Sequence, residues 1–292
     1  FAHKMRTIDS EKNVAILLPA SSAAIITNMA VLLNGQTAVN INFTTSTAAI
    51  QSGVKAAAIK TVYTSEKFIE KMQSRGLDVE AMLQGLNIVY LEELKEKVSK
   101  PLLAISFLLA RLLPAYGFYH LFGCKVNIND AAAILFSSGS EGTPKGIVLS
   151  HRNFMSNIKQ ISDVLKTRDD DVVMGCLPPF HSFGLTVTTF LPLIEGIPVV
   201  CHPDPTDVVN IAKAISRNKV TVMCATATFL RLYTKNKKVQ PLMLDSLRIV
   251  VAGAEKLSSD VREEFHDKFN KVIYEGYGAT ETTPVASVNI PD

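Results

Sequence analysis

Short apolar runs rich in β-branched residues alternate along the chain with longer segments of helical periodicity. Strands that alternate with helices pair in parallel, because each helix carries the chain back across the sheet before the next strand begins. Such a sheet has helices on both faces. The predicted strands are residues 14–19, 37–42, 56–64, 86–91, 131–137, 146–150, 172–177, 198–201, 220–225, 247–252 and 271–274. The predicted helices include residues 21–33, 65–75, 208–218 and 258–269.

One apolar insert at about 95–125 interrupts this alternation, which resumes after it. We therefore expect an α/β protein with two mainly parallel-sheet lobes and helices on both faces of each sheet. Residues 1–125, including the insert, form the first expected lobe, and residues 126–292 form the second. A chain of 292 residues is long enough for two such cores. Its 47% hydrophobic and 20% charged residues exclude a disordered chain.

The insert contains the apolar stretch PLLAISFLLARLLPAYGFYHLFG at residues 101–123. Its length approaches the ~20 residues that span a bilayer, but Arg111 and Pro114 weaken a spanning helix. A buried helix, an interfacial amphipathic helix and a transmembrane span are all compatible with it. Tyr116, Tyr119 and the flanking basic residues suit an interface. Those basic residues are Lys95, Lys97, Lys100 and Lys125.

Charge and cysteine spacing give no sign of nucleic-acid or zinc binding. The net charge of +3 argues neither for nor against a nucleic-acid partner, and the motifs described below lead us to expect none. No two of the four cysteines stand at C-x-x-C spacing, which disfavours a zinc site. The cysteines instead suit small core residues in a reducing compartment.

Residues 137–146 have the sequence SSGSEGTPKG, which is typical of a phosphate-binding loop. Glycines let backbone N–H groups turn toward an anion, hydroxyls donate further hydrogen bonds, and Lys145 supplies a mobile positive charge. A plain surface hairpin is the structural alternative. The segment is not a Walker A loop, because Gly146 follows Lys145 and the next residues favour a strand. The candidate nucleotide-binding residues here are Ser137, Ser138, Gly139, Ser140, Glu141, Gly142, Thr143 and Lys145.

The run ILFSSGSEGTPKG resembles the phosphate loop of the adenylate-forming superfamily, which includes acyl-CoA synthetases, luciferases and the adenylation domains of peptide synthetases. Three further segments support the resemblance in the family's order. They are FHSFGLTV at 180–187, VVAGAEKL at 250–257 and EGYGATE at 275–281. The resemblance implies the fold of the N-terminal domain of an adenylate-forming enzyme, here truncated.

Each supporting segment has a role implied by this resemblance. His181 lines the acyl pocket, where a neutral imidazole orients the reacting carboxylate; a satisfied core histidine is the alternative. The turn at Gly253 borders the adenine, since small residues admit a flat ring, although an ordinary strand-to-helix turn has the same pattern. Tyr277 stacks on the adenine, as an aromatic plane suits a purine.

The same resemblance completes the candidate site. The Thr280 hydroxyl bonds the α-phosphate, and Glu281 holds Mg²⁺, because a hard cation prefers carboxylate oxygen; a surface carboxylate is the alternative for Glu281. The implied catalytic residues are Lys145, His181, Thr280 and Glu281. The implied nucleotide contacts outside the loop are Gly253, Ala254, Glu255, Glu275, Gly276, Tyr277, Gly278 and Thr280.

A more specific similarity, through FSSGSEGTPKG and EGYGATETTPVASVNIP, is to the synthetase half of the bifunctional 2-acylglycerophosphoethanolamine acyltransferase/acyl-acyl-carrier-protein synthetase. It implies that a fatty acid is activated as acyl-AMP with ATP and Mg²⁺ and then passes to the thiol of acyl carrier protein. It also implies phospholipid reacylation at the cytoplasmic side of the bacterial inner membrane, with peripheral contact through residues 101–123.

Two alternatives to this function stay open: an acyl-CoA synthetase that uses CoA, and a non-catalytic nucleotide- or lipid-binding module. The family's C-terminal lid domain, with its catalytic lysine, is expected after Asp292, and the acyltransferase half before Phe1. We therefore expect this chain alone to hold a nucleotide but to make acyl-AMP poorly.

Overall fold

The computed structural model describes residues 2–8, 11–137 and 144–289, which form two compact units. The first unit comprises Phe1–Leu18 and Ser22–His151, and the second comprises Pro19–Ser21 and Arg152–Asp292. Each is an α/β layer structure built on a mainly parallel sheet with helices on both faces, so the predicted fold class is confirmed. The division falls after His151, not after residue 125, because the two strands that follow the insert join the first sheet.

The first sheet has the strand order β4-β3-β1-β2-β5-β6. All neighbouring strands are parallel except β5 and β6, which form an antiparallel pair. Both faces of β1 are buried: Val14 and Ile16 pack into one core, and Ala15 and Leu17 into the other. The strands are β1 Asn13–Ile16, β2 Thr37–Asn40, β3 Thr61–Thr64, β4 Asn87–Tyr90, β5 Ala131–Ser137 and β6 Lys145–Ser150.

Helices cover the two faces of this sheet separately. Apolar residues of α1, α2 and α6 join one core, and those of α3, α4 and α5 join the other. The predicted strand at 56–64 is wrong in its first half, because α3 continues to Ala56 and β3 starts only at Thr61. These helices are α1 Ala2–Ile8, α2 Ser22–Leu33, α3 Thr47–Ala56, α4 Glu66–Ser74, α5 Val79–Met82 and α6 Leu91–Glu96.

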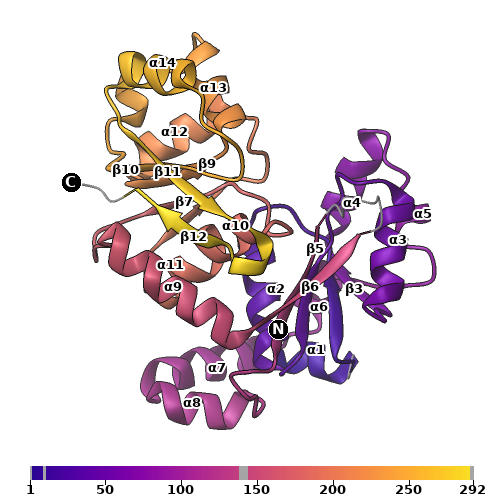
Figure 1. Ribbon diagram of the computed structural model, residues 1–292. Coiled ribbons are helices and arrows are strands. Elements are labelled where there is room, and N and C mark those ends of the chain that lie inside the picture. Colours follow the sequence, from indigo (N-terminus) through magenta and orange to yellow (C-terminus); the bar gives the residue numbers. More distant parts are fainter. Residues whose placement is uncertain (1, 9–10, 138–143, 290–292) are drawn as a thin grey trace. The chain divides into compact units, whose positions relative to one another are not determined.

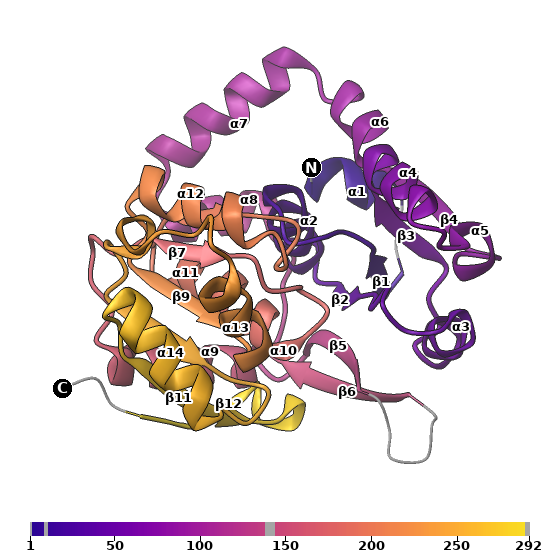
Figure 2. The same ribbon diagram turned by 90° about the horizontal axis from the view of Figure 1, so that it is seen from above.

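The apolar insert forms two short helices, α7 (Lys100–Leu112) and α8 (Ala115–Phe122), separated at Pro114. Neither helix has a buried residue, so the buried-helix alternative is wrong. In the described part of the chain, no helix has the length and apolarity needed to cross a membrane. In Figure 2, α7 extends away from α6 and from the strands of the first sheet.

The second sheet has the order β12-β11-β10-β9-β7-β8, and only β12 is antiparallel to its neighbour. Helices α12, α13 and α14 pack on one face, where Met223, Val250 and Ile273 lie in the core, and α9 and α11 lie on the other face (Figure 1). The strands are β7 Val173–Gly175, β8 Val199–Cys201, β9 Val222–Ala225, β10 Ile249–Ala252, β11 Ile273–Gly278 and β12 Val285–Val288. The α-helices are α9 His151–Leu165, α10 Ser182–Leu185, α11 Leu191–Ile194, α12 Val208–Asn218, α13 Ala227–Lys235 and α14 Ser259–Phe269. The remaining helical turns are the π-helix Thr186–Phe190 and the 3-10 helices Pro241–Leu244 and Thr280–Thr282.

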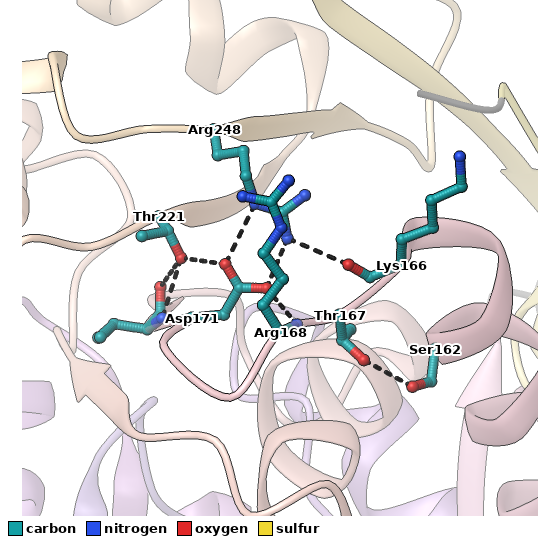
Figure 3. Close-up of polar contacts among 8 residues, drawn as sticks. Ser162, Lys166, Thr167, Arg168, Asp171, Thr221 and Arg248 are labelled. Carbon is teal, nitrogen blue, oxygen red and sulfur yellow. Dashed lines mark hydrogen bonds and ion pairs between the residues drawn. The ribbon is translucent and has the colours of Figure 1, made fainter. Parts of the chain in front are cut away.

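A buried carboxylate ties together the amino ends of β7, β9 and β10 (Figure 3). The side chain of Asp171 is 1% exposed; it accepts from Arg248 Nη2 at 2.5 Å and from Thr221 Oγ1 at 2.7 Å. The backbone N–H of Arg168 donates to the same carboxylate at 2.9 Å. Burial opposes ionisation of Asp171, but the hydrogen bonds from Arg248, Thr221 and Arg168 outweigh it and lower its pKa. Three strands are thereby fixed at the edge where they begin.

Replacing Arg248 with methionine should leave the Asp171 charge buried without its cation. We expect Arg248→Met to lower the unfolding free energy of the second unit by about 3 kcal/mol, measured by urea denaturation followed by circular dichroism. The matched control is Arg231→Met, which removes a pair with Asp260 whose side chains are 46% and 54% exposed. That control should cost less than about 1 kcal/mol. Equal losses in the two variants would contradict a structural role for the buried pair.

The same pair predicts a pH dependence. Because the pKa of Asp171 is lowered from 3.8, its stabilising contribution is present above that pH and is lost as the pH falls through the folded-state pKa. The stability difference between the wild-type chain and Arg248→Met should therefore be full at pH 7 and shrink below pH 3.8. Urea titrations at a series of pH values check this, and a difference that stays constant would exclude the ion pair as its source.

Candidate active site

Three of the predicted segments follow the carboxyl ends of strands in the second sheet. The His181 segment follows β7, the Gly253 turn follows β10, and β11 itself ends at Gly278. The strand order reverses between β7 and β9, since β8 lies on one side of β7 and β9, β10 and β11 lie on the other. Ligands of parallel α/β sheets bind at the carboxyl ends of strands near such a reversal. This edge of the sheet is therefore the candidate site of the second unit.

His181 stands at the start of α10, with extended backbone at φ −101° and ψ 140°. Its ring centroid lies 4.7 Å from that of Phe180, and its carbonyl accepts from the N–H of Leu185 at 2.9 Å. The helix requires glycine at 184, because a Cβ there would collide with the carbonyl oxygen of Pro178 in the preceding turn. His181 is exposed, yet the surrounding protein partly desolvates the imidazole and lowers its pKa, which favours the neutral ring at neutral pH.

Gly253 brings the three segments into contact. Its N–H donates to the carbonyl of Ala225 at 3.1 Å, which continues the pairing of β10 with β9. A Cβ at this position would lie 3.1 Å from a ring carbon of Phe183 and 3.5 Å from the carbonyl oxygen of Gly276. The His181 segment, the turn after β10 and the end of β11 therefore meet around one buried glycine.

The turn after β10 is also held to α13. Ala254 adopts the left-handed backbone conformation at φ 68°. The carboxylate of Glu255 accepts hydrogen bonds from the N–H of Thr228, and from its hydroxyl at 3.0 Å. Burial opposes ionisation of Glu255, but the bonds from Thr228 and Thr226 prevail and lower its pKa. The side chain of this predicted nucleotide contact thus binds the first turn of a helix, which the sequence analysis missed.

The hairpin of β11 and β12 carries the remaining candidates. A Cβ at Gly278 would collide with the carbonyl oxygen of Pro284, so the chain can turn here only with glycine. The Tyr277 residue is 73% exposed, which leaves its ring free for stacking. Thr280 and Glu281 lie in the 3-10 turn between the strands. Within the described residues the Glu281 carboxylate has no hydrogen-bond or ion-pair partner.

Glu275 has a structural partner in the second unit. Its carboxylate accepts from Arg262 Nη2 at 2.6 Å, and Arg262 Nη1 donates to the carbonyl of Ile273 at 3.0 Å. The guanidinium therefore joins α14 to β11. Two of the predicted nucleotide contacts, Glu255 and Glu275, thus use their side chains within the fold, so any contact they make to a nucleotide would come from their backbone.

The predicted phosphate loop connects β5 and β6 of the first unit. These strands form an antiparallel hairpin in which Ser137 pairs with Lys145 and Phe136 pairs with Gly146. A strand after Lys145 confirms that this is no Walker A loop, which opens into a helix. Lys145 is exposed. The remaining loop candidates lie outside the described residues: Ser138, Gly139, Ser140, Glu141, Gly142 and Thr143.

Comparison with known proteins decides the family, because the model of the AMP-binding enzyme family matches residues 1–292. The chain belongs to the AMP-binding enzyme family. It is 26% identical over 293 residues to 4-coumarate–CoA ligase 1 of Arabidopsis thaliana, an alignment that covers 99% of this chain and 51% of the relative. The chain thus spans about half the length of this curated relative, and less of several others.

Solved structures of other enzymes have the same fold. One is o-succinylbenzoate coenzyme A synthetase from Bacillus subtilis in complex with ATP and magnesium ion, with a TM-score of 0.76 and 21% identity over 99% of this chain and 55% of that one. Another is the fatty acid AMP ligase from Legionella pneumophila, with a TM-score of 0.76 and 19% identity over 99% of this chain and 50% of that one. At these identities the likeness shows the fold of this AMP-binding family member.

The one candidate metal ligand, Glu281, suits a cation that binds together with a phosphate-containing ligand. Among the residues that the structure describes, no group of three His, Cys, Asp or Glu side chains could hold a metal ion. Magnesium commonly binds through one or two carboxylates together with phosphate oxygens. The exposed carboxylate of Glu281 fits that pattern and does not form a closed site of its own.

Asn157 is a positioning residue that the sequence analysis missed. It lies on the apolar face of α9, is 5% exposed, and binds both backbone groups of Val285 at the start of β12. Its Nδ2 donates to the carbonyl at 2.8 Å, and its Oδ1 accepts from the N–H at 3.2 Å. The 3-10 turn with Thr280 and Glu281 is therefore anchored at its far end. The only sign of this role in the sequence was that Asn157, a polar residue, falls on the apolar face of a helix.

Asn157→Ala should release both backbone groups of Val285, which then lack their side-chain partner in a half-buried strand. We expect a loss of about 2 kcal/mol in the free energy that protects the Val285 amide. Hydrogen exchange read by mass spectrometry over the β11–β12 hairpin measures this loss. Ser156→Ala, at an exposed position of the same helix, is the control and should leave exchange unchanged. Unchanged exchange in Asn157→Ala would show that α9 does not hold the hairpin.

Proposed function

We propose that the whole protein activates a fatty acid with ATP and Mg²⁺ as acyl-AMP and transfers the acyl group to the thiol of acyl carrier protein. The observation that carries this proposal is the meeting of the His181 segment, the Gly253 turn and the Tyr277 strand at the carboxyl edge of one sheet. Membership of the AMP-binding family supports the acyl-AMP step. The similarity of FSSGSEGTPKG and EGYGATETTPVASVNIP to a fatty-acid-activating synthetase supports a fatty acid as the substrate.

The roles we propose follow from the chemistry of each group. The fatty acid carboxylate attacks the α-phosphorus of ATP, so one P–O bond forms as another breaks and pyrophosphate leaves. Lys145 would neutralise the β- and γ-phosphates, with Ser137 and the loop hydroxyls. Neutral His181 would orient the carboxylate without competing for its charge, and the Thr280 hydroxyl would bond the α-phosphate. Glu281 would hold Mg²⁺, which supplies further charge neutralisation at the phosphates.

The nucleotide base has a proposed place in the same unit. The exposed Tyr277 ring offers a plane for stacking, and the backbone of Gly253, Ala254 and Gly276 offers a surface without bulky side chains. The fixed side chains of Glu255 and Glu275 would keep that backbone in place. In a second step the thiol attacks the acyl carbon, and AMP leaves as the thioester forms.

The proposal also names the thiol that accepts the acyl group and the location of the protein in the cell. The resemblance of residues 130–292 supports acyl carrier protein, phospholipid reacylation and a location at the cytoplasmic side of the bacterial inner membrane, with contact through residues 101–123. The relationship to 4-coumarate–CoA ligase supports CoA as the alternative acceptor. Full-length protein assayed with fatty acid and ATP, and with either thiol, separates the two acceptors by the thioester formed.

Acid-dependent pyrophosphate exchange by the full-length protein tests the adenylation step. We expect exchange with a fatty acid panel and a loss of about 100-fold in Lys145→Met, because the phosphates lose a positioned cation. Lys238→Met, which changes an exposed lysine of a surface loop, is the matched control and should keep the wild-type rate. Nucleotide binding without acid-dependent exchange would favour the non-catalytic module instead.

The pH profile of exchange tests the proposed role of His181. Because desolvation lowers its pKa below 6.5, the ring is mainly neutral at pH 6.5 and above and becomes protonated as the pH falls through the lowered pKa. Exchange should therefore hold its rate down to pH 6.5 and fall below it. His181→Gln, which cannot titrate, should be slower at pH 7 and should lack this fall. If the exchange rate fell at the same low pH in both proteins, the titrating group would be one other than His181.

A further inference from the structure

The two helices of the insert expose more apolar surface than any other element that the structure describes. No residue of α7 or α8 is buried. The large apolar residues most exposed on α7 are Leu103 at 63%, Phe107 at 68% and Leu112 at 70%. On α8 they are Tyr116 at 76% and Leu121 at 63%. Exposed apolar surface of this extent marks a site for a partner, since single helices in water normally bury one face.

The base of this hairpin is fixed to the first unit. The Ser99 hydroxyl accepts from the N–H of Leu102 and begins α7. At the other end, Arg6 Nη2 donates to the carbonyl of Phe122 at 2.8 Å, and the N–H of Cys124 donates to the carbonyl of Leu33 at 2.9 Å. The apolar helices therefore project from a defined attachment point.

The charge of the segment selects one kind of partner. No aspartate or glutamate lies between Glu96 and Asp130, whereas the same stretch contains four basic residues. They are Lys97, Lys100, Arg111 and Lys125. A second copy of this surface would bring like charges together, which opposes self-association. A partner with an apolar interior and an anionic surface could bury the leucines and pair with the lysines.

The length and sequence of α7 and α8 indicate whether they would span a bilayer or lie along its surface. At 1.5 Å per residue, the 13 residues of α7 reach about 20 Å, short of the ~30 Å hydrocarbon core of a bilayer. Pro114 separates α7 from α8, so the two do not form one longer helix. Arg111, in the last turn of α7, also disfavours a position in the middle of the core. The helices are therefore suited to lie in the plane of the interface.

We infer that α7 and α8 are an interfacial anchor that binds the surface of an anionic phospholipid bilayer. The anchor deepens the location proposed above, to which it adds the lipid charge and the helices that make contact. Leu103, Phe107 and Leu112 enter the acyl boundary, while Lys100 and Lys125 pair with the headgroup phosphates. Lys97 lies beside them and pairs with Glu93 at 3.6 Å. Binding through this anchor would hold the chain at the membrane where the proposed phospholipid reacylation takes place.

Flotation with lipid vesicles tests the anchor. The chain should bind vesicles of phosphatidylcholine with phosphatidylglycerol, bind phosphatidylcholine alone more weakly, and be released by salt. Leu103→Ser with Phe107→Ser should weaken binding at least tenfold, because two apolar side chains no longer enter the lipid. Lys100→Gln with Lys125→Gln, at two exposed positions, should weaken binding to the anionic vesicles alone, by about fivefold for each lysine.

Matched controls separate this inference from the proposed chemistry. Leu242→Ser changes a residue that is 82% exposed in the second unit and should not alter vesicle binding. In the full-length protein, the Leu103→Ser and Phe107→Ser pair should keep the exchange rate measured without vesicles, which also shows that it folds. No vesicle binding, binding unaffected by the α7 variants, or concentration-dependent dimerisation through α7 in place of lipid binding would each overturn the anchor.

Discussion

Parallel pairing of β10 with β9 on one side and β11 on the other places the candidate site of the second unit. The register that sets Ala252 opposite Glu275 also sets Gly253 beside Gly276, one residue farther along both strands. At the opposite edge, the Asp171 carboxylate holds the segments that begin β7, β9 and β10. The sheet is thus fixed by a buried charge where its strands start and left free for a ligand where they end.

Three glycines at this edge are required for different steric reasons. Gly184 lets α10 lie close to the carbonyl of Pro178, and Gly278 lets the end of β11 approach that of Pro284. Gly253 has no such backbone collision, but its missing side chain gives room to the ring of Phe183. Backbone and ring atoms therefore occupy the space that side chains would fill.

The elements that the sequence predicted well are those decided by local pattern. The strand at 131–137 and the helix at 208–218 have the predicted bounds, since a continuous apolar run and a 3.6-residue period mark each of them. The strand at 56–64 failed in part because α3 ends in an alanine-rich stretch that continues into the following apolar run without a strong breaker. The edge strand β12 was not predicted, since its four exposed or half-buried residues are too few to show a strand pattern.

Contacts between distant segments could not be predicted from the sequence. The motif residues His181, Gly253 and Tyr277 were found because their spacing and neighbours match a family pattern. Nothing local marks Asn157 as the partner of Val285, which lies 128 residues farther along the chain. Nothing local marks Glu255 either as the partner of Thr228 in the first turn of α13. Both side chains support the candidate site through the backbone, so their contribution appears only once the strands are paired.

The insert shows how a three-dimensional structure narrows alternatives that composition leaves open. Composition allowed residues 101–123 to be buried, to span a bilayer or to lie at an interface. Exposure along α7 and α8 removes the first alternative, and the break at Pro114 leaves neither helix long enough for the second. Every other long helix of the two units buries at least one residue against its sheet. Apolar surface that the fold does not use is therefore concentrated in one basic segment, where a lipid surface can cover it.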